Sequence, residues 1–182
     1  YLFILFGGNV MFKKIGNNYD AYIEGLKKED PEAVTNILKG DYLGKISNIP
    51  IYKNASFMIN NGLYGACCVK DYLGNYYIVI DNLFSLLNKN TQEFLLCHEL
   101  GHYRRGHLEG VFGTIVDINN EFEADEYAAG LIGYQEAIDA LKEFYSKILS
   151  IQNKSNKIDT LLNISVNKAI FKARIKNLKK KK

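Results

Sequence analysis

The sequence has no disulfide framework, no long apolar segment and no visible export signal. It contains three cysteines in 182 residues, at Cys67, Cys68 and Cys97, and we expect all three to be small buried side chains. No apolar run approaches the roughly 18 residues that a membrane-spanning helix needs. Residues 2–6, the longest strongly apolar run near an end, lack a basic flank and are too short for a signal segment. We therefore expect no membrane span within this chain and a cytoplasmic location.

Acidic residues are missing from the last fifteen positions. Residues 168–182 hold eight basic side chains and no acid, so the remainder of the chain carries a formal charge of −5 against a total of +3. A basic run at a chain end is usually solvated. Contact with nucleic acid or an anionic membrane is the alternative interpretation. From this tail alone we do not expect a nucleic-acid partner.

The order of the elements predicts an α+β fold. A length of 182 residues and a hydrophobic content of 47% suit a single domain with a sizeable core. We expect N-terminal helices in residues 1–47, at 19–28 and 30–40, followed by a small antiparallel β-sheet in residues 48–81. Strands are predicted at 49–52 and 57–59, and a hairpin at 63–69 and 76–80. An edge strand of this sheet should lead directly into the next helix.

A helical half follows the sheet. We expect a short helical turn at 82–87, then a helix that begins at Asn90 as its N-cap, with Glu93 as the capping-box partner, and runs to about His107. Another helix is predicted at 120–131. Residues 82–131 thus form the first group of helices. Residues 134–182 supply C-terminal helices at 135–149 and 158–178, ending in the basic tail. The helix at 135–149 is predicted from an apolar stripe of Ala137, Ile138, Leu141, Phe144, Tyr145 and Ile148.

His98, Glu99 and His102 form an H-E-x-x-H pattern late in the helix expected from Asn90. Residues four apart share one face of a helix, so His98 and His102 can bind one metal ion while Glu99 serves as a general base. Gly101 lies between the two histidines. A glycine inside a helix costs up to about 1 kcal/mol relative to alanine, which indicates that something approaches the backbone there closely.

A third ligand is needed, because a catalytic zinc takes three protein ligands and keeps one position for water. The metzincin spacing fails, since Arg105 and Leu108 occupy the positions of its glycine and its third histidine. Instead, Glu121 and Asp125 share a face of a later helix. Glu121 can bind the metal while Asp125 accepts the N–H of a ligand histidine. The strand at 76–80, with a free edge, would hold an extended peptide beside this site.

The sequence resembles the gluzincin metallopeptidases at H-E-L-G-H-Y-R-R-G-H, which begins at His98, and at E-F-E-A-D-E-Y-A-A, which begins at Glu121. The similarity is greatest to the minigluzincins, the small soluble relatives of the heat-shock and CAAX-prenyl endopeptidase group. The ImmA/IrrE-type peptidases of mobile elements are also similar, usually with E-x-x-A-N. The resemblance covers about residues 76–178.

The resemblance implies a role for each matching residue. His98, His102 and Glu121 would bind Zn²⁺, Glu99 would be the base, and Asp125 would orient a ligand. Arg174, in Arg174-Ile175-x-x-Leu178, matches a family arginine and would stabilise the transition state. Lys168 stands where membrane members carry a histidine, so a solvated helix-face arginine is the alternative reading of Arg174.

His107 has two interpretations: a histidine favoured by the helix dipole, which we prefer, or a contributor to the cleft. The expected function is zinc-dependent hydrolysis of peptide bonds in a peptide or protein substrate. Two alternatives remain: a latent or inactive metal-binding minigluzincin module, and an ImmA/IrrE-like regulator of a mobile element that cleaves a repressor.

Overall fold

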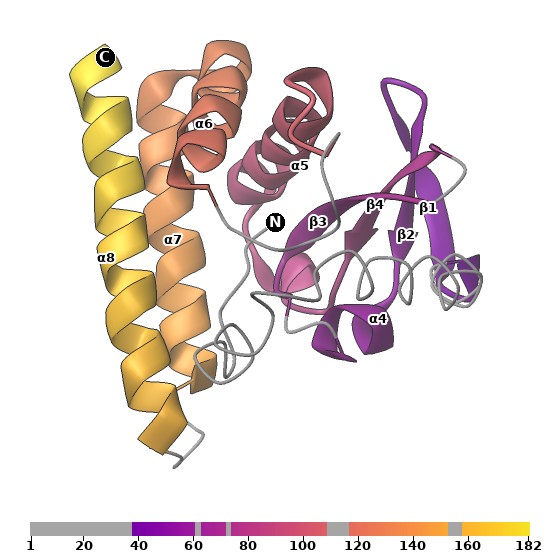
Figure 1. Ribbon diagram of the computed structural model, residues 1–182, viewed down its shortest axis with the longest axis horizontal. Coiled ribbons are helices and arrows are strands. Elements are labelled where there is room, and N and C mark those ends of the chain that lie inside the picture. The colour runs from indigo at the N-terminus through magenta and orange to yellow at the C-terminus, as the bar shows by residue number, and fades with distance from the viewer. Residues whose placement is uncertain (1–37, 61–62, 72–73, 109–116, 153–157) are drawn as a thin grey trace, which may run out of the picture.

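The protein is an α+β structure in which a small sheet packs beside a group of long helices (Figure 1). The computed structural model describes residues 38–60, 63–71, 74–108, 117–152 and 158–182. The helices expected at 19–28 and 30–40 lie outside the described residues, apart from the last three positions of the second. Within the described part of the chain, no helix has both the length and the apolar character needed to cross a bilayer.

The sheet has four strands in the order β1-β2-β4-β3. The strands are β1 (Asp41–Ile46), β2 (Ile49–Lys53), β3 (Ala66–Lys70) and β4 (Tyr76–Ile80), and a short helix, α4 (Ala55–Asn60), follows β2. β1 pairs antiparallel with β2, and β3 with β4, whereas β2 and β4 are parallel. The expected antiparallel sheet is therefore wrong, because the chain passes through α4 and β3 before β4 returns alongside β2.

Several local predictions also need correction. Residues 57–59 were expected as a strand and lie in α4, and β1 lies in the part expected to be helical. The strand at 76–80 was expected to have a free edge, but β4 is paired on both sides. The hairpin of β3 and β4 and the strand at β2 are confirmed.

The two faces of the sheet bury different residues. In β3, Ala66 and Cys68 face the long helices, while Cys67 and Val69 pack with Met58 of α4 on the other face. Side chains alternate between faces along a strand, so this strand contributes to both apolar clusters. All three cysteines are buried and form no disulfide bond, as the sequence indicated.

The helical half consists of a 3₁₀ turn, η1 (Phe84–Leu86), and four helices: α5 (Lys89–Arg104), α6 (Ile118–Ile132), α7 (Tyr134–Gln152) and α8 (Ile158–Lys181). The N-cap of α5 is Asn88, whose side-chain oxygen accepts a hydrogen bond from the Thr91 N–H at 2.8 Å. The prediction of Asn90 is wrong, because either asparagine can cap a helix and Asn88 lies where the preceding turn ends.

Helix α5 lies between the sheet and the other helices, and α7 and α8 run side by side (Figure 1). The expected apolar stripe of α7 is confirmed: Ile138, Leu141, Phe144 and Ile148 are all buried. Phe171 of α8 packs against the ring of Tyr145 at 4.9 Å between centroids. The core therefore fixes α5 against the sheet on one side and the α6–α8 group on the other.

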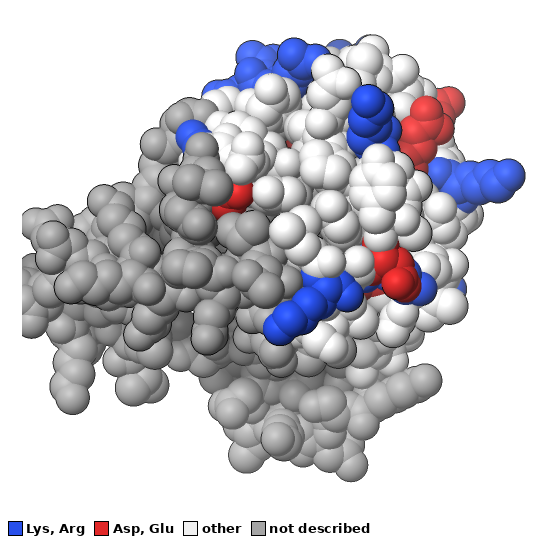
Figure 2. All heavy atoms as spheres, turned by 90° about the vertical axis from the view of Figure 1, so that its right-hand side faces the viewer, with Lys and Arg blue, Asp and Glu red and all other residues white. Residues whose placement is uncertain are grey.

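Figure 2 shows the face on the sheet side of the molecule. There the basic and acidic side chains of described residues are scattered among uncharged ones, and neither sign forms a continuous surface. The lysines of the C-terminal run belong to α8, where Lys168, Lys172, Lys176 and Lys179 are exposed. Arg174 of the same run is an exception, because it is almost completely buried.

Candidate metal centre

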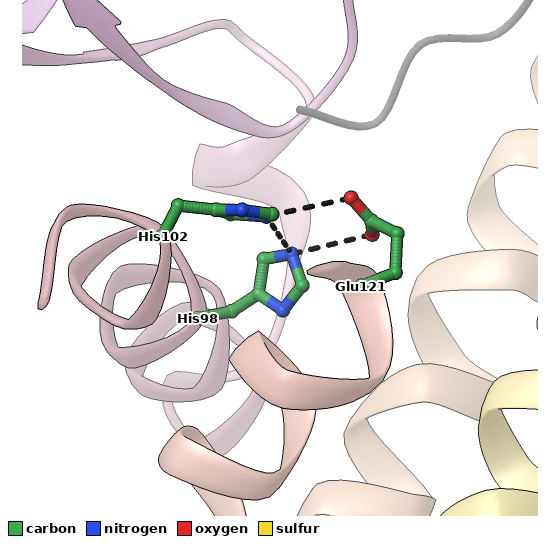
Figure 3. Close-up of side chains that lie close together, drawn as sticks. All are labelled: His98, His102 and Glu121. Carbon is green, nitrogen blue, oxygen red and sulfur yellow. Dashed lines mark hydrogen bonds and ion pairs between the residues drawn. The ribbon is translucent and has the colours of Figure 1, made fainter. Parts of the chain in front are cut away.

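His98 and His102 point toward one spot from the buried face of α5 (Figure 3). Their Nε2 atoms lie 3.1 Å apart, and the exposed fractions of the two residues are 2% and 3%. The spacing of four residues puts both rings on one helical face, as expected. One metal ion could therefore bind both ring nitrogens in this buried site.

Glu121 of α6 supplies a third donor to the same spot. Its Oε1 lies 3.4 Å from His102 Nε2, and its Oε2 lies 3.4 Å from His98 Nε2. Among the described residues, His98, His102 and Glu121 form the one group of at least three histidine, cysteine or acidic side chains that could hold a metal ion. The pairing of these three residues, proposed from the sequence pattern, is therefore seen in the structure.

Gly101 lets α6 approach α5 closely enough for Glu121 to reach the histidines. A Cβ placed on Gly101 would lie 3.0 Å from the Cα of Ala124 and 3.1 Å from its carbonyl oxygen. These are backbone atoms, which cannot rotate out of the way. The close contact expected at Gly101 is therefore the crossing of α5 and α6.

Asp125 lies one turn after Glu121 and contacts His98 from behind. Its Oδ1 is 2.9 Å from His98 Nδ1, and the residue is fully buried. A carboxylate at this nitrogen fixes the proton on Nδ1 and leaves Nε2 as the metal-binding atom. The role of Asp125 expected from the sequence therefore agrees with its position.

Arg174 of α8 is 1% exposed and lies beneath the donor set. Its Nε and Nη2 donate to the two oxygens of Asp125, at 2.8 and 2.6 Å. Its Nη1 is 2.9 Å from Glu121 Oε2, an ion pair. The interpretation of Arg174 as a solvated helix-face residue is therefore wrong. Its guanidinium binds the carboxylates of Asp125 and Glu121.

Burial and pairing determine the charge of these groups. Burial, the largest single influence, raises the pKa values of Glu121 and Asp125, but Arg174 and the site histidines together outweigh it, and both pKa values fall below their ordinary range. Burial lowers the pKa of His102 to about 4. Burial and the charge of Arg174 both lower the pKa of His98. Its interactions with the carboxylates of Asp125 and Glu121 outweigh them, so the pKa of His98 is raised.

The donor set fits a divalent cation in three respects. Tetrahedral zinc with ligand distances of about 2.0–2.1 Å separates its donor atoms by about 3.3–3.4 Å. The two Nε2 atoms lie 3.1 Å apart, and each has a different Glu121 oxygen at 3.4 Å. Glu121 Oε2 is buried, and its contacts with Arg174 and His98 are ion pairs without hydrogen-bond geometry. Glu99, Glu121, Asp125 and Arg174 together have a formal excess of two negative charges in a buried place, which a divalent ion would neutralise.

Glu99 is held beside the donor set by the sheet. Its Oε2 accepts a hydrogen bond of 2.7 Å from the backbone N–H of Cys68 in β3, and the residue is 1% exposed. Because successive residues of a strand alternate in direction, Cys68 presents its backbone groups to the edge of β3 that faces away from β4. Among the described strands, the edge strand next to the site is thus β3, and not β4 as expected.

His107 lies at this site, although the sequence analysis preferred to interpret it as a helix-end histidine. Its Nδ1 lies 2.9 Å from Nδ1 of His102, and its Nε2 lies 3.3 Å from Oε2 of Glu123. Helix α5 ends at Arg104, and Gly106 has a φ of 69°. The N–H of His107 bonds to the carbonyl of His102 at 3.0 Å, and that of Gly106 to Tyr103 at 3.2 Å.

This hydrogen-bond pattern is a Schellman motif, which ends many helices at a glycine. The motif brings the residue after the glycine back to the residue five positions earlier, so it places His107 against His102. Gly106 was the sequence signal that could have located His107. The structure therefore favours the second interpretation of His107, as a side chain of the site.

Searches against protein-family models, curated proteins and solved structures found no match for this chain.

Proposed function

We propose that the protein is a zinc-dependent metalloendopeptidase of the gluzincin type. The observation that carries the proposal is the buried triangle of His98, His102 and Glu121 with Glu99 held beside it. Two imidazoles, one carboxylate and an adjacent carboxylate that is not a ligand are the residues that zinc-dependent hydrolysis requires. Zinc suits this set better than magnesium or calcium, which prefer oxygen ligands alone.

The chain supplies a base and the residues that hold the donors. Bound zinc would lower the pKa of a water molecule and polarise a peptide carbonyl. Glu99 takes a proton from the attacking water, whose oxygen bonds to the carbonyl carbon, and passes that proton to the leaving nitrogen as the C–N bond breaks. The Cys68 N–H fixes the Glu99 carboxylate for both transfers.

The outer edge of β3, which pairs with no further strand among the described residues, is the proposed ledge for the substrate. Ala66 and Cys68 present their backbone groups to this edge, next to Glu99. An extended peptide can add to an exposed sheet edge through main-chain hydrogen bonds, which recognise a peptide backbone largely independently of its sequence. This supports a peptide or protein substrate.

Arg174 acts in this proposal as a positioning residue. Its guanidinium is engaged by Asp125 and Glu121 and is buried, so it maintains the geometry of His98 and Glu121. We therefore replace the expected transition-state role by this one. Lys168, at the family histidine position, is exposed on α8.

Glu99→Gln tests the proposal. The amide keeps the size of the side chain but cannot accept the proton, so the variant should retain zinc and lose cleavage of a fluorogenic peptide library by about 10²-fold or more. The matched control is Glu93→Gln, on the same helix and outside the donor set. Undiminished cleavage by the zinc-loaded Glu99→Gln variant would sink the proposal.

A latent metal-binding module is a second candidate, and the position of Arg174 favours it. Arg174, which was expected to stabilise the oxyanion, is buried. Peptide hydrolysis would therefore need another hydrogen-bond donor for the oxyanion. Zinc binding without any chelator-sensitive cleavage of casein or of the peptide library would select this candidate. Chelator-sensitive cleavage would select the peptidase.

A further inference from the structure

We propose that His107, supported by Glu123, is the residue that orients His102 and sets its tautomer for metal binding. The inference rests on the proposed function, because His102 is a ligand of the same site. The two ligand histidines each have one nitrogen turned toward the donor triangle and one turned away. Asp125 contacts the far nitrogen of His98, and His107 contacts the far nitrogen of His102.

The proton assignment follows from the chemistry of imidazole. To bind a metal through Nε2, a neutral His102 must carry its proton on Nδ1 and needs an acceptor there. The atom 2.9 Å away is Nδ1 of His107. It can accept only if His107 carries its own proton on Nε2, and that nitrogen lies 3.3 Å from the Glu123 carboxylate. Each group in the series therefore has the donor or acceptor that its neighbour requires.

The backbone holds His107 in this place. The Schellman motif at Gly106 returns the chain toward His102, and the His107 side chain is only 7% exposed although it follows the end of α5. The rings of His102 and His107 lie 5.1 Å apart between centroids and are inclined at 72°. This edge-on arrangement directs the nitrogen of one ring at the other.

Glu123 is one of four acidic residues in α6, and it lies between Glu121 and Asp125 in the sequence. Glu121, Glu123 and Asp125 are spaced by two residues, so Glu123 turns away from the face shared by the other two. It is 52% exposed and meets His107 at the outer side of the site. The two ligand histidines are thus both supported from α6, one directly by Asp125 and the other through His107.

The test is zinc affinity of the full chain, measured by competition with a chromophoric chelator. His107→Leu removes the acceptor and should weaken zinc binding by about 10- to 100-fold. His107→Gln offers an amide oxygen as acceptor and should recover most of that loss, which a purely steric role of the ring would not produce. Arg105→Leu, an exposed position on the same turn, is the matched control and should leave the affinity unchanged.

Glu123→Gln gives a second test, since its exposed side chain can change without disturbing the core. It should weaken zinc binding less than His107→Leu does, and it should add nothing in the His107→Leu background. Wild-type affinity in both His107→Leu and Glu123→Gln, with affinity lost in His102→Ala, would overturn the inference and leave the proposed function standing. A wild-type chain that binds no zinc would overturn both.

Discussion

Gly101 of α5 and Ala124 of α6 touch through their backbones, and this contact sets the distance between the two helices that carry the donors. A Cβ on Gly101 would come within 3.0 Å of the Ala124 Cα. Ala124 lies between Glu121 and Asp125 on α6. Any displacement of the helix at this contact therefore moves the third donor and the residue that orients His98.

We expect Gly101→Ala to weaken zinc binding by about tenfold or more, because the added methyl group separates α5 from α6. Alanine gains about 1 kcal/mol of helix propensity, and the overpacking costs about 1–3 kcal/mol, so the metal-free stability should change little or fall. Gly130→Ala in α6 is the matched control, because its Cβ would meet no atom within 4 Å. It should stabilise the protein and leave zinc affinity unchanged. Chelator competition and thermal unfolding measure both quantities, and tight zinc binding by Gly101→Ala would contradict the account.

Arg174→Met should destabilise the metal-free protein by about 3–5 kcal/mol. The substitution leaves Asp125 and Glu121 buried without their counter-charge, and an uncompensated buried charge is costly. Zinc should restore part of the loss, because it neutralises the same carboxylates. Lys172→Met, at an exposed position of α8, should change stability by less than about 0.5 kcal/mol. Urea unfolding with and without zinc measures these effects, and equal stability of the two variants would refute the positioning role of Arg174.

The metal-free protein should lose stability as the pH falls below about 5. Glu121 and Asp125 have depressed pKa values because Arg174 and the site histidines together outweigh the effect of their burial. A carboxyl group with a depressed pKa contributes stability above its unfolded value of about 4 and loses it as the pH falls toward the folded value. The lowered pKa of His102 adds a loss from about pH 6.5 downward, whereas the raised pKa of His98 acts in the opposite direction.

Urea unfolding in chelator across pH 3–7 should therefore give a nearly level stability down to about pH 5, followed by a steep decline. In Arg174→Met the carboxyl pKa values are no longer held down, so the decline should be shallower. The same slope in both proteins would show that Arg174 does not control these groups.

The sequence was sufficient to predict the parts of the site that depend on helical spacing. His98 and His102 are four apart on a capped helix, as are Glu121 and Asp125, so each pair had to share a face. The apolar stripe of α7 followed from the same periodicity. The hairpin of β3 and β4 was predicted, but the parallel pairing of β2 with β4 could not be, because a five-residue strand carries no pattern that fixes which strand lies on its other side.

The contacts of Arg174 and His107 depended on tertiary structure. For Arg174 the family match predicted a transition-state role and its lysine-rich helix a solvated side chain, whereas the packing of α8 against α6 buries it against Asp125 and Glu121. His107 follows the end of α5, and the turn at Gly106 decides where it lies. Sequence spacing thus identified the metal donors, whereas the residues that hold them required the fold.

The central claim is that His98, His102 and Glu121 hold one metal ion. Zinc content of the purified protein after dialysis, by atomic spectroscopy, tests it most directly. We predict one zinc per chain in the wild type and in the control Glu126→Ala, a neighbouring acid outside the donor triangle, and a marked loss in Glu121→Ala. Full zinc content in a folded Glu121→Ala variant, or none in the wild type, would contradict the account.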